Sequence, residues 1–478
     1  MSIEHYKWFF EEQSLEFWIP DWENNWSWLT IIVWPNNTWK TTIIESILIQ
    51  TKQESSGAYW RESKFSSSER HELNPPKITI QFLNQEWLIG NVVYTNIDNW
   101  SQVKRIPSDI WHNILFDVIQ SRRFWQAKTS QTLSEEHFLR SSRYALPRNS
   151  TWVDTAAILK TINADPQKKE TFNRLIKSII NITWWTIDTD DENNDFIVYN
   201  TWSWGSHQSW LLWDWVISVF RICAQLINSN NTTIIIDEPE LSLHPQAQKK
   251  LAKVLSEKAK DRQIIICTHS PYFINRKDLL NWAKFVRLNK YNDDKCTIHQ
   301  LWNPQDYLIT EGSLNNYQQP EFLDIASKEI MFSEKILFVE WKEDVWLIKK
   351  FIKEYREELN WEIDFDIFWY WSWWWPRIKK FLKMASDMWI KKVWAIYDWD
   401  VEEGYVNEVC NLFPNYDIER LNTDDIRDKN KMIIYKLNGE TEVKERKEWI
   451  FYENWEIKDD KKDYFKSIIQ NLIVYYNS

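Results

Sequence analysis

The sequence predicts an α/β protein built on mostly parallel sheets. Three short β-branched runs, at 31–33, 234–236 and 264–267, have the composition of buried strands. A segment with the spacing of a helix, 245–260, separates the last two runs, and this strand–helix–strand order is typical of a parallel sheet. A second strand–helix series begins near residue 335, so the 478 residues are expected to form more than one domain.

Tryptophan is abundant in this chain and glycine is scarce. There are 35 Trp and 6 Gly, whereas glycine ordinarily makes up about 7% of a protein. The tryptophans stand where turns need glycine, as in the run W-S-W-W-W-P at 371–376. We therefore hypothesise that most of them are glycines displayed through the wrong codon table, one reassigned codon such as UGA being rendered as Trp. The alternative is a genuinely Trp-rich protein.

The run at 31–33 leads into the pattern of a phosphate-binding Walker A loop. Lys40 and Thr41 stand where G-x-x-x-x-G-K-[ST] places the phosphate lysine and the magnesium hydroxyl, while Trp34 and Trp39 occupy both glycine positions. An indole at position 39 would fill the space that the phosphates need, so ATP binding depends on the glycine hypothesis. The residues expected to bind ATP in this loop are Trp34, Asn36, Asn37, Thr38, Trp39, Lys40, Thr41 and Thr42, with Thr41 also a Mg²⁺ ligand.

The segment from 106 to 187 has long polar runs with apolar residues at helical spacing, and we expect a helical arm there. Its part at 121–148 has more basic than acidic residues and could contact nucleic acid. A solvated arm or a dimerisation segment explains the same pattern equally well. The basic residues are Arg122, Arg123, Lys128, Arg140, Arg143 and Arg148, against Glu135 and Glu136.

The strand at 234–236 ends in two acids, the arrangement of a Walker B motif. Asp237 is expected to join the Mg²⁺ shell and Glu238 to align a water with the γ-phosphate of ATP. His269 follows the next strand, at 264–267, where an imidazole can hydrogen-bond the γ-phosphate and report its presence. The sequence Glu-Leu-Ser-Leu-His-Pro, at 240–245, comes directly after the Walker B motif.

A fourth motif, L-L-W-D-W at 211–215, precedes an apolar helix. With glycine at 213 and 215 it resembles the signature loop of ABC-type ATPases, in which a helix N-terminus of one subunit caps the γ-phosphate bound by the other. The matching residues are Leu212, Trp213, Asp214 and Trp215. The four motifs in this order resemble the compact RecF/SMC-like branch of that superfamily. The resemblance implies an AAA-type, ABC-type P-loop ATPase domain that dimerises with ATP.

A second site is expected where two later strands end. Glu340 ends one strand and is followed by Asp344, and Asp398 and Asp400 end another as D-x-D. Parallel neighbouring strands would bring these carboxylates to one sheet edge, where clustered negative charges need Mg²⁺ or Mn²⁺. Such a site can support two-metal phosphodiester chemistry.

V-E-W-x-x-D followed by D-x-D resembles the Toprim fold of topoisomerases, primases and OLD-family nucleases. An ABC-type ATPase with a helical insertion, followed by a smaller Toprim α/β domain, resembles the OLD family of ATP-dependent endonucleases, which are often linked to phage defence. The resemblance implies that Asp398 and Asp400 are catalytic metal ligands, that Glu340 is a ligand or general base, and that Asp344 supports the second metal. It also implies DNA as substrate. Trp341 and Trp399, in literal form, would crowd this site.

These motifs predict an order of domains. The ATPase domain is expected at 1–310, with its helical arm at about 106–187. A linker is expected at 311–330, the Toprim domain at 331–440 and a helical tail at 441–478.

Charge and cysteine usage indicate the compartment. The formal net charge is −11, which argues against a surface coated for phosphate binding but permits local basic patches. The four scattered cysteines include no C-x-x-C pair, and Cys223 and Cys267 lie in apolar runs as buried thiols do. Neither a signal-peptide core nor a membrane-spanning apolar run is seen. We expect a soluble cytoplasmic protein that forms a homodimer or a higher homo-oligomer.

Three functions remain open from the sequence. The first is an ATP-hydrolysing, metal-dependent DNA endonuclease, in phage defence or DNA repair. The second is a RecF/SMC-like DNA-binding ATPase whose Toprim domain does not cut, and the third is primase-like nucleotidyl transfer by that domain.

Overall fold

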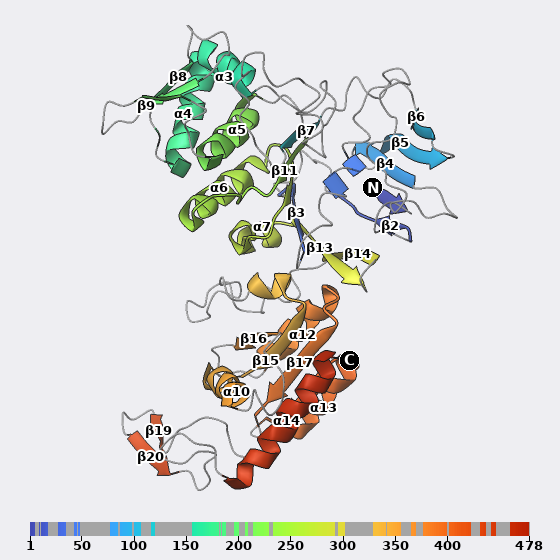
Figure 1. The fold of residues 1–478 in the computed structure, drawn as a ribbon, viewed down its shortest axis with the longest axis vertical. Coiled ribbons are helices and arrows are strands. Elements are labelled where there is room, and N and C mark those ends of the chain that lie inside the picture. Colours follow the sequence, from blue (N-terminus) through green and yellow to red (C-terminus); the bar gives the residue numbers. More distant parts are fainter. Residues whose placement is uncertain are drawn as a thin grey trace. The chain divides into compact units, whose positions relative to one another are not determined.

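The computed structural model divides the chain into two compact units, Met1–Trp302 and Asn303–Ser478 (Figure 1). The structure describes residues 1–4, 9, 11–17, 27–34, 43–44, 46–47, 77–84, 87–97, 100–106, 116–119, 155–180, 182, 184–187, 196–199, 206–208, 214–228, 233–291, 295–301, 328–340, 342–354, 365–369, 376–398, 401–421, 431–435, 441–445 and 459–477.

The main sheet of the first unit has six strands in the order β14-β13-β3-β12-β11-β7. All neighbours run parallel except β13 and β14. Isoleucine and valine fill the central strands because both faces of a parallel sheet are covered. The strands are β3 (Leu29–Val33), β7 (Phe116–Ile119), β11 (Thr233–Asp237), β12 (Gln263–Cys267), β13 (Lys284–Tyr291) and β14 (Lys295–Leu301).

The register of the main sheet aligns the carboxyl ends of its three central strands. β12 lies between β3 and β11, and Cys267 at its end pairs with Ile32 on one side and with Asp237 on the other. The Walker A loop is therefore expected to start at the same edge at which the Walker B strand ends. The predicted α/β class with parallel strands is confirmed for this unit.

Helices pack on the main sheet and on one another. α4 (Pro166–Ile180) is capped by Asp165, whose carboxylate accepts from the amides of Gln167 and Lys168. Its buried Phe172 joins Trp185 and Phe220 in an aromatic cluster with centroid distances of 5.1 to 6.1 Å. The other helices of this unit are α3 (Thr155–Ala164), α5 (Asp214–Asn228), α6 (Pro245–Lys258), η4 (Pro271–Phe273) and α7 (Arg276–Leu280).

The expected helical arm at 106–187 is only partly helical. It contains α3 and α4, but also β7, which pairs with β11 at the edge of the main sheet. It ends in β8 (Trp184–Ile187), which pairs with β9 (Phe196–Tyr199) and through it with β10 (Ser206–Gln208). Strand pairing with distant residues overrides the local helical pattern there. The basic residues at 122–148 lie outside the described residues.

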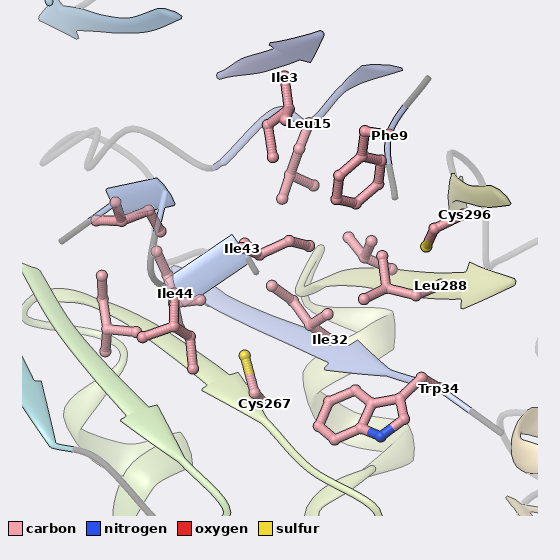
Figure 2. Close-up of a cluster of buried hydrophobic side chains, with 14 of the residues drawn as sticks. Ile3, Phe9, Leu15, Ile32, Trp34, Ile43, Ile44, Cys267, Leu288 and Cys296 are labelled. Carbon is pink, nitrogen blue, oxygen red and sulfur yellow. The ribbon is translucent and has the colours of Figure 1, made fainter. Parts of the chain in front are cut away.

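An antiparallel sheet of order β2-β1-β4-β5-β6 packs beside the main sheet. Its residues Ile3 and Ile78 share a buried cluster with Ile32, Trp34 and Leu288, as Figure 2 shows in part. Cys267 and Cys223 are buried free thiols, as predicted. The strands are β1 (Ser2–Glu4), β2 (Gln13–Ser14), β4 (Lys77–Asn84), β5 (Trp87–Ile97) and β6 (Trp100–Ile106).

The second unit is built on a parallel sheet of order β16-β15-β17-β18. Its strands are β15 (Lys335–Val339), β16 (Asp366–Trp369), β17 (Lys392–Tyr397) and β18 (Asp417–Arg420). Its helices are η6 (Ile330–Phe332), α10 (Lys342–Glu354), α12 (Pro376–Asp387), α13 (Glu403–Leu412) and α14 (Asp459–Asn477), and β19 (Lys431–Tyr435) pairs with β20 (Thr441–Glu445).

The tail after 441 begins with strand β20 rather than with a helix, and becomes helical at Asp459. The helix α14 is part of the core of the second unit. Phe465, Leu472 and Tyr476 are buried in one cluster with Leu337 and Trp394. The apolar spacing along α14 therefore reflects a face packed on the sheet.

Two tryptophans stand at helix ends in a backbone conformation typical of glycine. Trp282 has φ 68° and Trp389 has φ 53°. The amide of Trp282 donates to the carbonyl oxygen of Leu279, and the amide of the next residue donates to that of Asp278. At the other position, the amide of Trp389 donates to the carbonyl oxygen of Ser386, and the next amide donates to that of Ala385. The N···O distances are 2.8 to 3.2 Å. This is the Schellman motif, whose left-handed residue is usually glycine, and a bulky residue there is strained. Both positions support the glycine hypothesis.

Trp185 has the surroundings of a genuine tryptophan. It is 5% exposed, packs edge to face on Phe172, and its indole N–H donates to Asn173 Oδ1 at 2.5 Å. A glycine at that position would leave a hole in the aromatic cluster. The structure thus separates positions that fit glycine from at least one that fits tryptophan.

No helix in the described parts of the chain combines the length and the apolarity needed to cross a bilayer.

Candidate functional site

The Walker A loop itself lies outside the described residues, from Asn36 through Thr42. Its flanks are described: Trp34 follows β3, and Ile43, Ile44, Ser46 and Ile47 are helical and buried. The expected strand–loop–helix context is therefore present on both sides of the loop. Trp34 lies at the carboxyl end of β3 in Figure 2 and is 1% exposed.

Trp34 packs edge to face against the imidazole of His269, with 4.1 Å between the ring centroids. The pattern places the first glycine of the loop at position 34. With glycine there, the space of the indole would open directly beside His269. The two predicted ATP-site residues therefore lie together at the edge where the phosphate loop begins.

The Walker B acids stand at the end of β11. Asp237 is the last residue of the strand and is 5% exposed. Glu238, directly after it, is half-buried and has φ 46°, a conformation that non-glycine residues adopt rarely and at a cost. Its amide donates to the carbonyl oxygen of Cys267 at 2.8 Å, which ties it to the end of β12. Strained backbone of this kind is common at active sites.

The residues before His269 connect it to the central strands. The amide of Thr268 donates to the carbonyl oxygen of Ile32 at 3.0 Å, so the turn after β12 is fixed to the end of β3. Thr268 is fully buried, and His269 is half-buried. The sheet thus brings Asp237, Glu238 and His269 to one edge, beside the start of the Walker A loop.

Glu240 is a further residue of this site, and the sequence marked it only as the first residue of the Glu-Leu-Ser-Leu-His-Pro motif, with no role of its own. Its carboxylate accepts from the Thr268 hydroxyl at 2.8 Å and from the His269 amide at 2.7 Å. The motif itself does not indicate which groups the Glu240 carboxylate contacts. The pairing with residues 28 and 29 positions away along the chain is a property of the fold.

The signature motif is described only in part. Leu212 and Trp213 lie outside the described residues, Asp214 is the first residue of α5, and Trp215 is half-buried. A helix therefore begins where the signature loop is expected to end. A helix N-terminus favours anions because its first amides have no partner within the helix.

The second unit brings three of its four predicted carboxylates to one edge region. Glu340 follows β15, Asp398 follows β17, and these two strands are parallel neighbours. The amide of Asp398 donates to Glu340 Oε1 at 3.0 Å. Asp344 lies near the start of α10, and Asp344 and Asp398 are each 2% exposed. Asp400 lies outside the described residues.

Oxygen donors of this kind fit Mg²⁺ or Mn²⁺. Among the residues that the structure describes, however, no three His, Cys, Asp or Glu side chains are arranged to hold a metal ion. Asp400 is expected to complete the set and is not described. The chemistry of the donors fits a divalent cation, while the set of described ligands is incomplete.

Tyr397, which is buried, and Tyr405, which is half-buried, stand beside this edge. Burial raises the pKa of Tyr405 to about 12, with the charges of Glu408 and Glu340 contributing. Burial also raises the pKa of Tyr397, to which Tyr405 and Glu340 add. Both phenols, which are protonated at neutral pH already at their ordinary pKa, therefore stay protonated further into alkaline pH, as expected next to a carboxylate-rich edge.

Comparison with known proteins places an ATPase in the first unit. The model of an AAA ATPase domain (AAA_15) matches residues 215–274, which span α5, β11, α6, β12 and His269. OLD nuclease from Thermus scotoductus is 36% identical over 129 residues, 26% of this chain and 23% of that protein. Endonuclease GajA from Bacillus cereus HuB5-5 is 28% identical over 144 residues, 27% of this chain and 21% of that protein.

The chain thus spans less than a quarter of the length of these curated relatives. Among solved structures, an SMC head domain bound to the C-terminal winged-helix domain of ScpA superposes with a TM-score of 0.44 at 13% identity, over 64% of this chain and 98% of that one. The predicted resemblance to OLD-type proteins is confirmed over the ATPase region.

Proposed function

We propose, starting from an AAA ATPase domain homologous to that of OLD-type nucleases, that the chain is an ATP-hydrolysing, metal-dependent DNA endonuclease. The observation that carries the proposal is the pairing of β15 with β17, which brings Glu340 and Asp398 together at one sheet edge in a chain that also has an ATPase domain. Phage defence or DNA repair is the proposed setting.

The ATPase half of the proposal assigns a role to each residue at the carboxyl ends of β11 and β12. In the loop after β3, Lys40 and Thr41 would hold the phosphates and Mg²⁺, and Asp237 at the end of β11 would complete the magnesium shell. Glu238 orients the attacking water, and its backbone conformation fixes where the carboxylate points. The imidazole of His269 hydrogen-bonds the γ-phosphate.

The nuclease half rests on the carboxylates of the second unit. Glu340, Asp344, Asp398 and Asp400 would hold the divalent cations, which supply charge stabilisation for an attacking and a leaving oxygen when bound. Glu340 is oriented by the Asp398 amide. Asp344 and Asp398 are each 2% exposed, so a cation bound by them would be shielded from bulk water. The resemblance of this unit to a Toprim domain remains part of the proposal.

The second candidate is a RecF/SMC-like DNA-binding ATPase whose second unit does not cut. The observation that favours it is that the matching family model, an AAA ATPase domain, covers residues 215–274 in the first unit alone. Primase-like nucleotidyl transfer is a third outcome of the same site, and primer synthesis from nucleotides would point to it.

Nicking of supercoiled plasmid with Mg²⁺ or Mn²⁺ separates these functions. The assay uses protein with glycine at positions 34, 39, 341 and 399. We expect Asp398→Asn to abolish nicking and Lys40→Ala to abolish ATP hydrolysis while nicking persists. Asp366→Asn is the matched control, because Asp366 is an exposed acid at the opposite end of the neighbouring strand β16. Intact ATP hydrolysis without any nicking would instead support the second candidate.

A further inference from the structure

Two turns face each other at the edge of the main sheet where ATP is expected. The first is 238–243, which follows β11, and the second is 268–270, which follows β12. We call the contacts between them the clasp. The clasp joins the segment that contains Glu238 to the segment that contains His269.

Glu240 forms the centre of the clasp. Its two carboxylate oxygens accept from different donors, Oε2 from the Thr268 hydroxyl at 2.8 Å and Oε1 from the His269 amide at 2.7 Å. The Thr268 hydroxyl in turn accepts from the Ser270 amide at 3.0 Å. Hydrogen bonds to an ionised acceptor are among the stronger ones in proteins, and here they fix the backbone on which the imidazole stands.

Gln248 adds a second connection between the same two turns. Its Oε1 accepts from the Ser270 hydroxyl at 2.6 Å, and its Nε2 donates to the carbonyl oxygen of Leu243 at 2.7 Å. Gln248 stands in the first part of α6, so this connection also joins the clasp to that helix.

The first turn is stiffened from within. The amide of Leu241 donates to the carbonyl of Glu238 at 3.1 Å, and the amide of Leu243 to that of Glu240 at 2.9 Å. Glu238 and Ser242 are both in the left-handed region, with φ 46° and 61°. A turn held in this way transmits a displacement at one end to the other, because few of its torsions are free to absorb it.

We infer that Glu240 is a positioning residue for ATP hydrolysis, which holds the backbone of His269 in register with Glu238. The inference rests on the proposed ATPase function and goes beyond it. His269 touches the γ-phosphate and Glu238 the attacking water, so the in-line geometry of hydrolysis depends on the distance that Glu240 sets between them.

The first test measures hydrolysis of Mg-ATP in three variants, each made in the protein that has glycine at positions 34, 39, 341 and 399. Glu240→Ala is expected to lower kcat about tenfold or more while KM stays within about twofold, because the ligand contacts themselves remain. Glu240→Gln keeps one acceptor and is expected to fall between Glu240→Ala and the unchanged protein. Glu257→Gln, an exposed acid further along α6, is the matched control and is expected to hydrolyse ATP at the unchanged rate.

The second test asks whether Glu240 acts through His269. The double variant Glu240→Ala/His269→Ala is expected to be no slower than His269→Ala alone, since the imidazole that Glu240 positions is then gone. If the double variant instead loses activity by the product of the two single-variant factors, the inference is overturned, because two independent effects on the rate multiply. Equal rates for Glu240→Ala and Glu257→Gln would overturn it as well.

Hydrogen exchange separates failure of the clasp from failure of the ATPase proposal. The His269 amide, bonded to Glu240, is expected to exchange at least about tenfold faster in Glu240→Ala than in Glu257→Gln without nucleotide, while the amides of β12 are unchanged. Unchanged exchange would mean that the clasp does not hold His269 and would overturn the inference. If even the control hydrolysed no ATP, the ATPase proposal would fail and the catalytic role of Glu240 with it, whatever the exchange result.

Discussion

Glu238 stands in a backbone conformation that its side chain disfavours, at the place where the proposed water-orienting carboxylate is needed. A non-glycine residue in the left-handed region costs about 1–3 kcal/mol and persists only where the surroundings impose it. The Cys267 carbonyl and the turn at 238–243 supply those surroundings. The strained backbone of Glu238 thus lowers the stability of the protein at the position where the proposed hydrolysis requires a carboxylate.

We predict that Glu238→Gly raises the free energy of unfolding by about 1 kcal/mol and abolishes ATP hydrolysis, because strain is relieved and the carboxylate is lost. Ser242→Gly, which relieves a positive φ of 61° in the same turn, is the stability control and should give a similar gain. Urea unfolding followed by circular dichroism measures both. A Glu238→Gly variant less stable than the unchanged protein would contradict this account of the strain.

Three tryptophans offer a direct test of the glycine hypothesis. Trp282→Gly and Trp389→Gly are each expected to stabilise the protein by about 1 kcal/mol or more, since each residue closes a helix at positive φ. Trp185→Gly is the opposite case and is expected to cost about 3–5 kcal/mol, because it removes the centre of an aromatic cluster.

Peptide mass spectrometry of the protein from its source checks the same three positions without mutation. We expect glycine masses at 282 and 389 and a tryptophan mass at 185. Tryptophan masses at both 282 and 389 would leave their backbone conformation unexplained and would count against the reassigned codon.

Secondary-structure elements differ in how far the sequence predicts them. β3, β11 and β12 were predicted because short continuous β-branched runs are typical of parallel strands that are buried on both faces. β7, with the sequence F-D-V-I, was not, since it lies in the segment expected to be a helical arm, and four residues are too few to show a strand pattern without the pairing with β11. The site follows the same rule. Asp237 and His269 are marked by their place at or after a strand end. Glu240 is visible in the sequence only as the start of the 240–245 motif, and its role is revealed by its contacts across the fold.

The helix α14 shows the limit of an apolar pattern. Its spacing predicts a helix with one buried face, yet the sequence does not say that this face packs on Leu337 and Trp394. We predict that Leu472→Ala, at a fully buried position, destabilises the second unit by about 2–5 kcal/mol. Val474→Ala, at a position that is 67% exposed, is the matched control and should stay within about 0.5 kcal/mol. Equal effects of the two changes in chemical denaturation would place α14 off the sheet.

The whole chain joins an ATPase domain to a carboxylate-rich sheet. Its assembly state depends on contacts between copies, which the two units of a single chain do not show. The signature motif is proposed to act on ATP bound by another copy, so an ATP-loaded chain that cannot hydrolyse should dimerise. We predict that Glu238→Gln with Mg-ATP elutes at twice the 58.4 kDa chain mass in light scattering, and that Lys40→Ala, which lacks the phosphate lysine, stays monomeric under the same conditions.

The dependence of the dimer on salt concentration is a further test of this prediction. Two chains of formal net charge −11 repel each other, and at about 0.15 M salt charges separated by more than about 8 Å are screened. Because ATP-dependent contacts form against that repulsion, we predict that the ATP-bound dimer of Glu238→Gln grows stronger as salt rises from low concentration. If local ion pairs hold the two copies together, the dimer should weaken instead. A dimer that forms equally well without nucleotide would show that the signature motif does not bridge subunits through ATP, and the proposed cross-subunit role of Asp214 and Trp215 should then be abandoned.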